Sequence, residues 1–110
     1  MYKLADNRVF NWIILLKEPK DNGEFEEHQI KVCYRRKRQS ELTKLMEDYQ
    51  LGITSERDIL DAIFVDFVDG IEGGPSDPKE FRERMLDEPG VVAAIVSAYS
   101  DAIAGISRKK

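Results

Sequence analysis

The sequence contains very few of the residues that build disulfides and metal sites. Among 110 residues there is one cysteine, Cys33, and one histidine, His28. A single cysteine cannot form an internal disulfide, which is typical of proteins in a reducing compartment. A single histidine excludes a zinc site with two or more histidine ligands. We therefore expect neither a disulfide framework nor a histidine-rich metal centre, and no cofactor.

Long apolar runs and targeting signals are also missing. The longest unbroken apolar stretches cover residues 12–16 and 91–96, whereas a membrane-spanning helix needs about 20 such residues. The first residues do not combine a charged start, an apolar segment and a small-residue cleavage site, so they do not resemble a secretory signal. The sequence therefore predicts a cytoplasmic protein without a membrane partner.

The composition is that of one small acidic domain. Hydrophobic residues make up 42% of the chain, which is too much for a disordered protein, and 17 Lys and Arg against 21 Asp and Glu give a net charge of −4. The length fits one domain, but it lies near the lower limit for a self-sufficient core. We expect a single domain over residues 1–110 that buries its core efficiently or shares burial with a partner.

The first third of the chain has the pattern of a β-hairpin. Residues 9–17 are mostly β-branched, aromatic or aliphatic and form one strand. The Asn22-Gly23 pair is a strong turn signal, and a return strand follows over residues 24–36. Because side chains alternate along a strand, one face of the first strand carries Phe10, Trp12, Ile14 and Leu16. The opposite face carries Val9, Asn11, Ile13 and Leu15.

From Gln39 onward the apolar period changes from 2 to about 3.6 residues, which predicts four helices. The first helix is expected to start after Ser40 and to end before Gly52, and the second to start near Thr54-Ser55 with an apolar stripe that runs on through Phe67. The third is expected to start at the N-cap Asp77, and the fourth to start at Pro89 and to end near Gly105.

The predicted fold is therefore α+β: an N-terminal two-stranded antiparallel β-hairpin (residues 1–37) is followed by about four α-helices (residues 39–106) packed around one core. A basic tail covers residues 107–110.

The chain offers little equipment for catalysis. On one strand, Cys33 and His28 point to opposite faces and lie about 16 Å apart, so they do not form a nucleophile–base pair. The acidic residues between Asp66 and Asp77 lack the spacing of a calcium loop. The glycines of residues 70–74 lack the strand before them and the Lys-Ser/Thr after them that a phosphate loop requires. We expect no enzyme, since one would need a metal or cofactor that the sequence does not indicate.

Charge is unevenly distributed. Residues 31–38 hold five bases and no acid, whereas residues 56–88 hold eleven acids and four bases. Such polarity favours self-association as well as steering of a charged partner. Tyr34 and the bases up to Arg38 are a candidate nucleic-acid patch, and the alternative function is that of a small adaptor or regulatory protein that binds nucleic acid through it. The pI of about 5.1 instead favours a solvated strand end or an acidic protein partner.

The first strand is more apolar than expected for a two-stranded hairpin that exposes one face to solvent. Two interpretations stay open. Either helices cover both faces of the hairpin, or one face or edge binds a segment of another protein.

The order of motifs along the chain resembles that of small tail assembly chaperones of long-tailed bacteriophages and prophages. The resemblance is carried by the N-terminal stretch of residues 2–12 with Trp12, by the turn of residues 19–23, by Tyr34-Arg35-Arg36 followed by Gln39-Ser40-Glu41-Leu42, and by the Ala-rich C-terminal helix of residues 91–104 with its basic end.

The resemblance implies a non-enzymatic role. Proteins of this family bind the long helical tape-measure protein, keep it soluble and help tail tube subunits to assemble around it in the bacterial host cytoplasm. In many relatives a ribosomal frameshift near the end of the gene adds a second domain, and Lys109-Lys110 is compatible with a slippery codon pair. We expect partner contact through an apolar set on the hairpin, Trp12, Ile14 and Leu16, and through an electrostatic rim, Arg35, Arg36 and Arg38.

Overall fold

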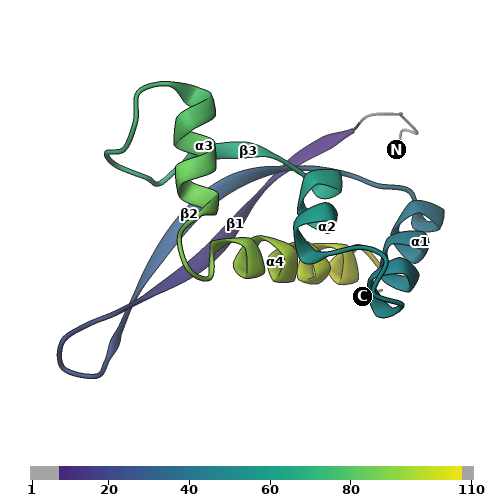
Figure 1. Ribbon diagram of the computed structural model, residues 1–110, viewed down its shortest axis with the longest axis horizontal. Helices are drawn as coiled ribbons and strands as arrows, with labels where there is room; N and C mark the ends of the chain where they lie inside the picture. Colours follow the sequence, from purple (N-terminus) through teal and green to yellow (C-terminus); the bar gives the residue numbers. More distant parts are fainter. Residues whose placement is uncertain (1–7, 108–110) are drawn as a thin grey trace.

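The described residues form a three-stranded antiparallel sheet and four helices (Figure 1). This computed structural model describes residues 8–107, and side chains as far as residue 104. The elements in chain order are β1 (Val9–Pro19), β2 (Phe25–Arg35), α1 (Gln39–Gln50), α2 (Glu56–Ile63), β3 (Phe64–Asp69), α3 (Pro78–Leu86) and α4 (Val91–Ser107). The predicted α+β class is confirmed. Residues 2–7 of the N-terminal motif and residues 108–110 of the basic tail lie outside the described part.

β1 and β2 form the predicted hairpin. Their pairing runs without a break from Val9 opposite Arg35 to Pro19 opposite Phe25. Gly23 closes the turn with a positive φ of 84°, and its N–H donates to the carbonyl of Lys20 at 3.2 Å. The far half of the hairpin projects away from the helices (Figure 1).

The predicted alternation of the hairpin is confirmed as well. One face carries the buried residues Ile14, Ile30, Val32 and Tyr34. The opposite face carries Val9, Ile13 and Leu15, each about half exposed.

The sequence prediction missed a third strand. The second helix ends at Ile63, and Phe64–Asp69 is β3, which pairs with β2 in the sheet order β1-β2-β3. Phe64 lies opposite Tyr34 and Phe67 lies opposite Val32, so the register slips by one residue between them. This bulge lets two residues three apart point to the core from one strand. The bulge explains why Phe64 and Phe67 have the i, i+3 spacing of a helix although they lie on a strand.

Gly70 ends β3 at a place that admits no side chain. Its φ is 95°, and a Cβ there would lie 2.6 Å from the backbone oxygen of Gln29. The close approach of the two backbones therefore requires glycine.

The helix starts agree with the sequence in two of four cases. The Ser55 hydroxyl accepts the N–H of Asp58 at 3.2 Å, and the Asp58 carboxylate accepts the N–H of Ser55 at 3.0 Å. These hydrogen bonds lower the pKa of Asp58. Asp77 caps α3 by accepting the N–H of Glu80 at 3.0 Å.

The other two helices start elsewhere. The N-cap of α1 is Arg38 and not Ser40, because the carbonyl of Arg38 accepts the first helical N–H, from Leu42, at 3.0 Å. α4 begins at Val91 and continues past Gly105 to Ser107.

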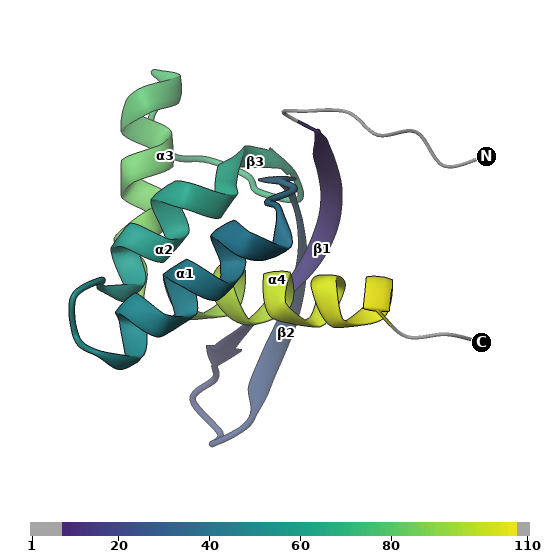
Figure 2. The same cartoon turned by 90° about the vertical axis from the view of Figure 1, so that its right-hand side faces the viewer.

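The helices gather on one face of the sheet, and α4 lies across the hairpin (Figure 2). Buried side chains of both layers meet there: Ile14, Ile30, Val32, Tyr34, Ile59, Leu60, Ile63, Phe64, Leu86, Val91, Ile95 and Tyr99. None of the helices in the described part is long and apolar enough to cross a membrane.

Candidate functional site

An apolar groove separates α1 from α2 and α4. Its volume is about 520 Å³. The described apolar residues that line it come from all three helices: Leu42, Leu45, Met46, Ile59, Ile63, Val96, Tyr99, Ile103 and Ala104. Glu47 is the one charged residue among the described residues of the lining. A groove with this size and lining is suited to bind apolar side chains.

The groove stays open because α1 does not close onto the core. No residue of α1 is buried, although Leu42 and Leu45 are half-buried against its neighbours. Met46 is 51% exposed and Tyr49 is also largely exposed. Leu51, at the end of the helix, is 74% exposed. The apolar stripe of α1 therefore lacks the cover that an amphipathic helix normally has.

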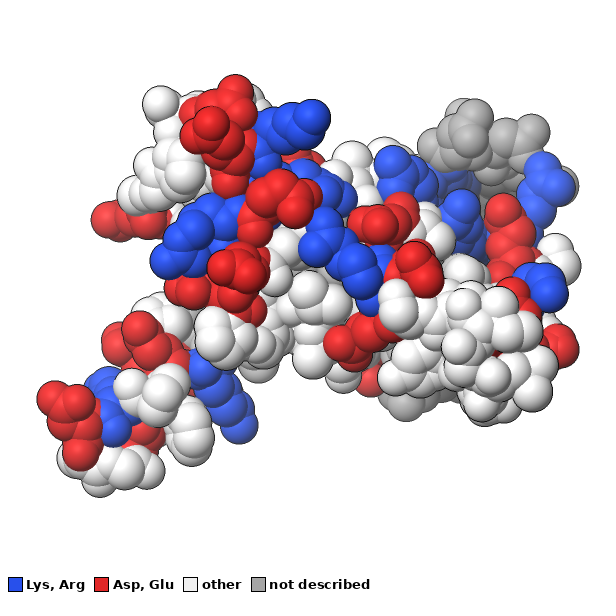
Figure 3. Space-filling view, in the orientation of Figure 1, with Lys and Arg blue, Asp and Glu red and all other residues white. Residues whose placement is uncertain are grey.

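The surface around α1 differs in charge from the rest of the molecule. Figure 3 shows acidic and basic side chains crowded over α2 and α3, and a largely uncharged area over the end of α1 and the turn that follows it. Leu51 and Ile53 are the large apolar side chains exposed in that turn.

The outer face of the sheet is a second uncovered apolar surface. It carries Val9, Ile13 and Leu15 from β1. Val68 of β3 is also half exposed. Of the two interpretations of the apolar hairpin, cover on both faces is therefore wrong for the described residues. One face packs on the helices and the other is open.

The apolar hairpin residues predicted to contact a partner lie in three different environments. Ile14 is 1% exposed and belongs to the core, so its side chain is not available to a partner in the folded protein. Leu16 is half-buried against the same core. Trp12 is 43% exposed beside a hollow of about 240 Å³ between β1 and α4.

Of the three arginines of the predicted rim, Arg35 bonds to the fold through its side chain, and Arg36 and Arg38 do so through their backbone N–H groups. Nη1 of Arg35 donates to the carbonyl of Phe64 at 2.9 Å and to that of Asp61 at 3.3 Å. Both carbonyls lie at the C-terminal end of α2, where a positive charge also interacts favourably with the helix dipole. The N–H of Arg36 donates to the carbonyl of Arg8, and the N–H of Arg38 donates to the carboxylate of Glu41 at 2.9 Å. Arg35 therefore has a structural role that the sequence did not reveal.

Tyr34 is not placed to stack on a base. It is fully buried, and its hydroxyl donates to the carbonyl of Ile95 at 2.6 Å. Burial raises the pKa of Tyr34 above its ordinary value, so the hydroxyl keeps its proton. The candidate nucleic-acid patch thus loses its aromatic member, and its bases occupy the strand end and the cap of α1.

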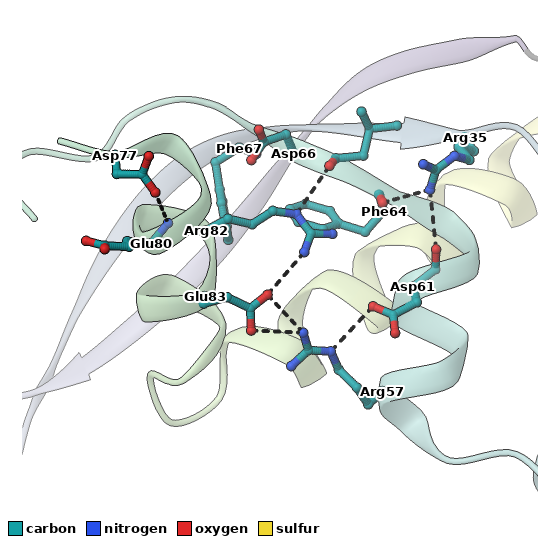
Figure 4. A network of polar contacts seen from close by, with 11 residues as sticks. Arg35, Arg57, Asp61, Phe64, Asp66, Phe67, Asp77, Glu80, Arg82 and Glu83 are labelled. Carbon is teal, nitrogen blue, oxygen red and sulfur yellow. Dashed lines mark hydrogen bonds and ion pairs between the residues drawn. The ribbon is translucent and has the colours of Figure 1, made fainter. Parts of the chain in front are cut away.

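A polar network ties α3 to α2 and β3 (Figure 4). Arg57 contacts Asp61 at 3.4 Å and Glu83 at 3.2 Å. Arg82 donates to the carbonyl of Val65 and lies over the ring of Phe64, 5.1 Å from its centroid. The hydrogen bond to the Glu83 carboxylate raises the pKa of Arg57, so the guanidinium keeps its positive charge. These contacts are mostly solvent-exposed and position α3.

The titratable groups of the hairpin form one further cluster. Among the described residues, Glu18, Glu26 and His28 bring possible ligand atoms within 4.8 Å of one another. Nε2 of His28 lies 3.1 Å from Glu18, and both carboxylates are more than half exposed. Water competes strongly for ligands at such a surface position. Cys33 pairs with Asn11 and His28 with Leu16, so they lie on opposite faces of the sheet, as predicted.

Comparison of the chain with models of protein families, with curated proteins and with solved structures gives no match.

Proposed function

We propose that this protein is a non-enzymatic chaperone of bacteriophage tail assembly, which binds a helical segment of the tape-measure protein in the groove between α1, α2 and α4. The single observation that carries the proposal is the apolar groove beside a helix without any buried residue. An amphipathic helix that places apolar side chains in such a groove covers surface on both proteins.

The physical role follows from this arrangement. A long apolar helix aggregates unless its apolar stripe is covered. The groove supplies cover, and the net charge of −4 together with the charged surface over α2 and α3 keeps the complex soluble. The tail tube protein is a second candidate partner at the stage when the tape-measure protein is handed over. The complex forms in the bacterial host cytoplasm.

The order of sequence motifs supplies the identity of the proposed partner. It resembles that of tail assembly chaperones over nearly the whole chain, and the groove is independent of that resemblance. A tube gene upstream and a very long tape-measure gene downstream of this gene are the expected genomic context. A context without either gene contradicts the assignment to phage tails.

The direct test is co-expression with the tape-measure protein of the same genome, followed by affinity capture. Met46→Glu places a charge in the groove at a position that is 51% exposed, so we expect normal folding and at least about a tenfold loss of binding. Phe25→Glu is the matched control, since Phe25 is exposed at the tip of the hairpin. Equal capture of both variants, each folded by circular dichroism, contradicts the groove as the binding site.

A further inference from the structure

The free edge of β1 is unusually well suited to pair with another strand. β1 is at the end of the sheet order β1-β2-β3, so no described strand lies on its other side. Residues 10–16 contain no charge, no proline and no glycine. Sheet edges are normally protected by charges, proline or bulges, and an edge without them is a template for pairing.

The hydrogen-bond pattern identifies which residues face that edge. At one end of the hairpin the N–H of Lys20 donates to Glu24, and at the other the N–H of Arg36 donates to Arg8. The register between these ends is unbroken, so bonded pairs alternate and all even-numbered residues of β1 bond to β2. The backbone groups of Val9, Asn11, Ile13, Leu15 and Lys17 therefore point to the free edge.

From this geometry we propose that two copies of the chain associate by antiparallel pairing of β1 with β1, about a two-fold axis at Ile13. Only a register centred on an odd-numbered residue joins the free N–H and C=O groups of both copies. With the centre at Ile13, the uncharged segment of residues 10–16 in one copy lies opposite the same segment of the other copy. A centre at Leu15 would set Trp12 opposite Glu18 of the other copy.

Charge complementarity selects the same register. With the axis at Ile13, Arg8 of each copy lies opposite Glu18 of the other, so opposite charges close both ends of the uncharged segment. Pairs at such non-bonded positions have the closer spacing, about 4.5 Å between Cα atoms.

Trp12 supplies the apolar part of the contact. In this register Trp12 of one copy lies opposite Ile14 of the other, on the face that carries α4. The hollow of about 240 Å³ beside β1 is lined by residues 12–15 of the strand, Trp12 included, and by Ala94, Ser97, Ala98 and Asp101 of α4. The exposed indole of each copy thus meets a hollow next to the strand of the other, and two-fold symmetry forms this contact twice.

The experiment is sedimentation equilibrium of the full chain from about 1 to about 300 µM. We expect a monomer–dimer equilibrium for the wild type. Ile13→Lys sets two like charges opposite each other at the axis and is expected to weaken the dimer at least about tenfold. Val68→Lys is the matched control, since Val68 is as exposed as Ile13 but lies on β3. A wild type that stays monomeric throughout the range overturns the proposal.

Charge reversal and cross-linking test the register. Arg8→Glu and Glu18→Arg each weaken the dimer, and the double variant restores it if the two residues pair. In a Cys33→Ala background, Ile13→Cys forms a disulfide between copies, because Cα atoms of bonded pairs lie about 5.5 Å apart, whereas Val68→Cys does not. A dimer that resists Ile13→Lys, or whose single charge reversals are not rescued by the double variant, overturns the proposed pairing. Met46→Glu leaves the dimer intact, which separates this proposal from tape-measure binding.

Discussion

α1 and α4 each carry an apolar stripe, but the two helices have very different positions in the protein. α4 buries Val91, Ile95 and Tyr99, and two tyrosine hydroxyls fix it to the sheet: Tyr34 donates to Ile95, and Tyr99 donates to the carbonyl of Arg35 at 2.9 Å. α1 buries no residue and leaves a groove beside it. A periodic stripe thus predicts a helix, but it does not tell whether the same chain covers the stripe.

The largest expected effect lies in α4. Ile95 is fully buried in the core, so Ile95→Ala removes packed methyl groups and leaves a cavity. We expect a loss of about 2–5 kcal/mol in the free energy of unfolding. Urea denaturation followed by circular dichroism measures it. A loss below about 1 kcal/mol would show that α4 is held as loosely as α1.

A smaller effect is expected for the hydrogen bond between the sheet and α4. Tyr34→Phe keeps the ring packed against Phe10 and Phe64 but removes the donor to Ile95. We expect a loss of about 1 kcal/mol at neutral pH. Denaturation of both proteins at the same pH gives the difference.

The pH dependence of the free energy of unfolding, compared between the wild type and Tyr34→Phe, isolates the contribution of this hydroxyl. Because burial raises the pKa of Tyr34 above its ordinary value of 10.0, its contribution is complete below about pH 10 and is lost as the pH rises through the folded-state pKa. Burial also raises the pKa of Tyr99, so part of the alkaline loss persists in Tyr34→Phe. Identical alkaline profiles for the wild type and the variant would contradict a role for Tyr34.

The smallest expected effect lies in α1. Met46 is half exposed in the groove, and alanine is a good helix former, so Met46→Ala should change the free energy of unfolding by no more than about 0.5 kcal/mol. The measurement is the same denaturation series. A loss approaching that of Ile95→Ala would mean that α1 closes onto the core in solution, and the contrast between the two helices would disappear.

Much of the fold could be predicted from local patterns. Alternation in β1 and the Asn22-Gly23 turn gave the hairpin and its faces, and Ser55 and Asp77 marked two helix starts. These features depend on neighbouring residues, which the sequence displays directly.

The errors concern contacts between distant segments. Phe64 and Phe67 continued the helical stripe of α2, and only the pairing with β2, through a bulge in β3, makes that segment a strand. The burial of Ile14 under α4 and the bonds of Arg35 to the end of α2 also depend on the tertiary arrangement. The stripe of α1 was predicted, but its lack of cover could not be, because exposure is a property of the assembled fold.

The order of elements has a consequence for synthesis on the ribosome. The hairpin is local in sequence and can form as soon as residues 9–35 emerge, whereas α4, which covers its core face, is made more than fifty residues later. During that interval both faces of β1 are exposed to solvent. The nascent chain is therefore most prone to aggregate before residues 91–107 appear, and slow translation of the middle of the gene would lengthen that exposure.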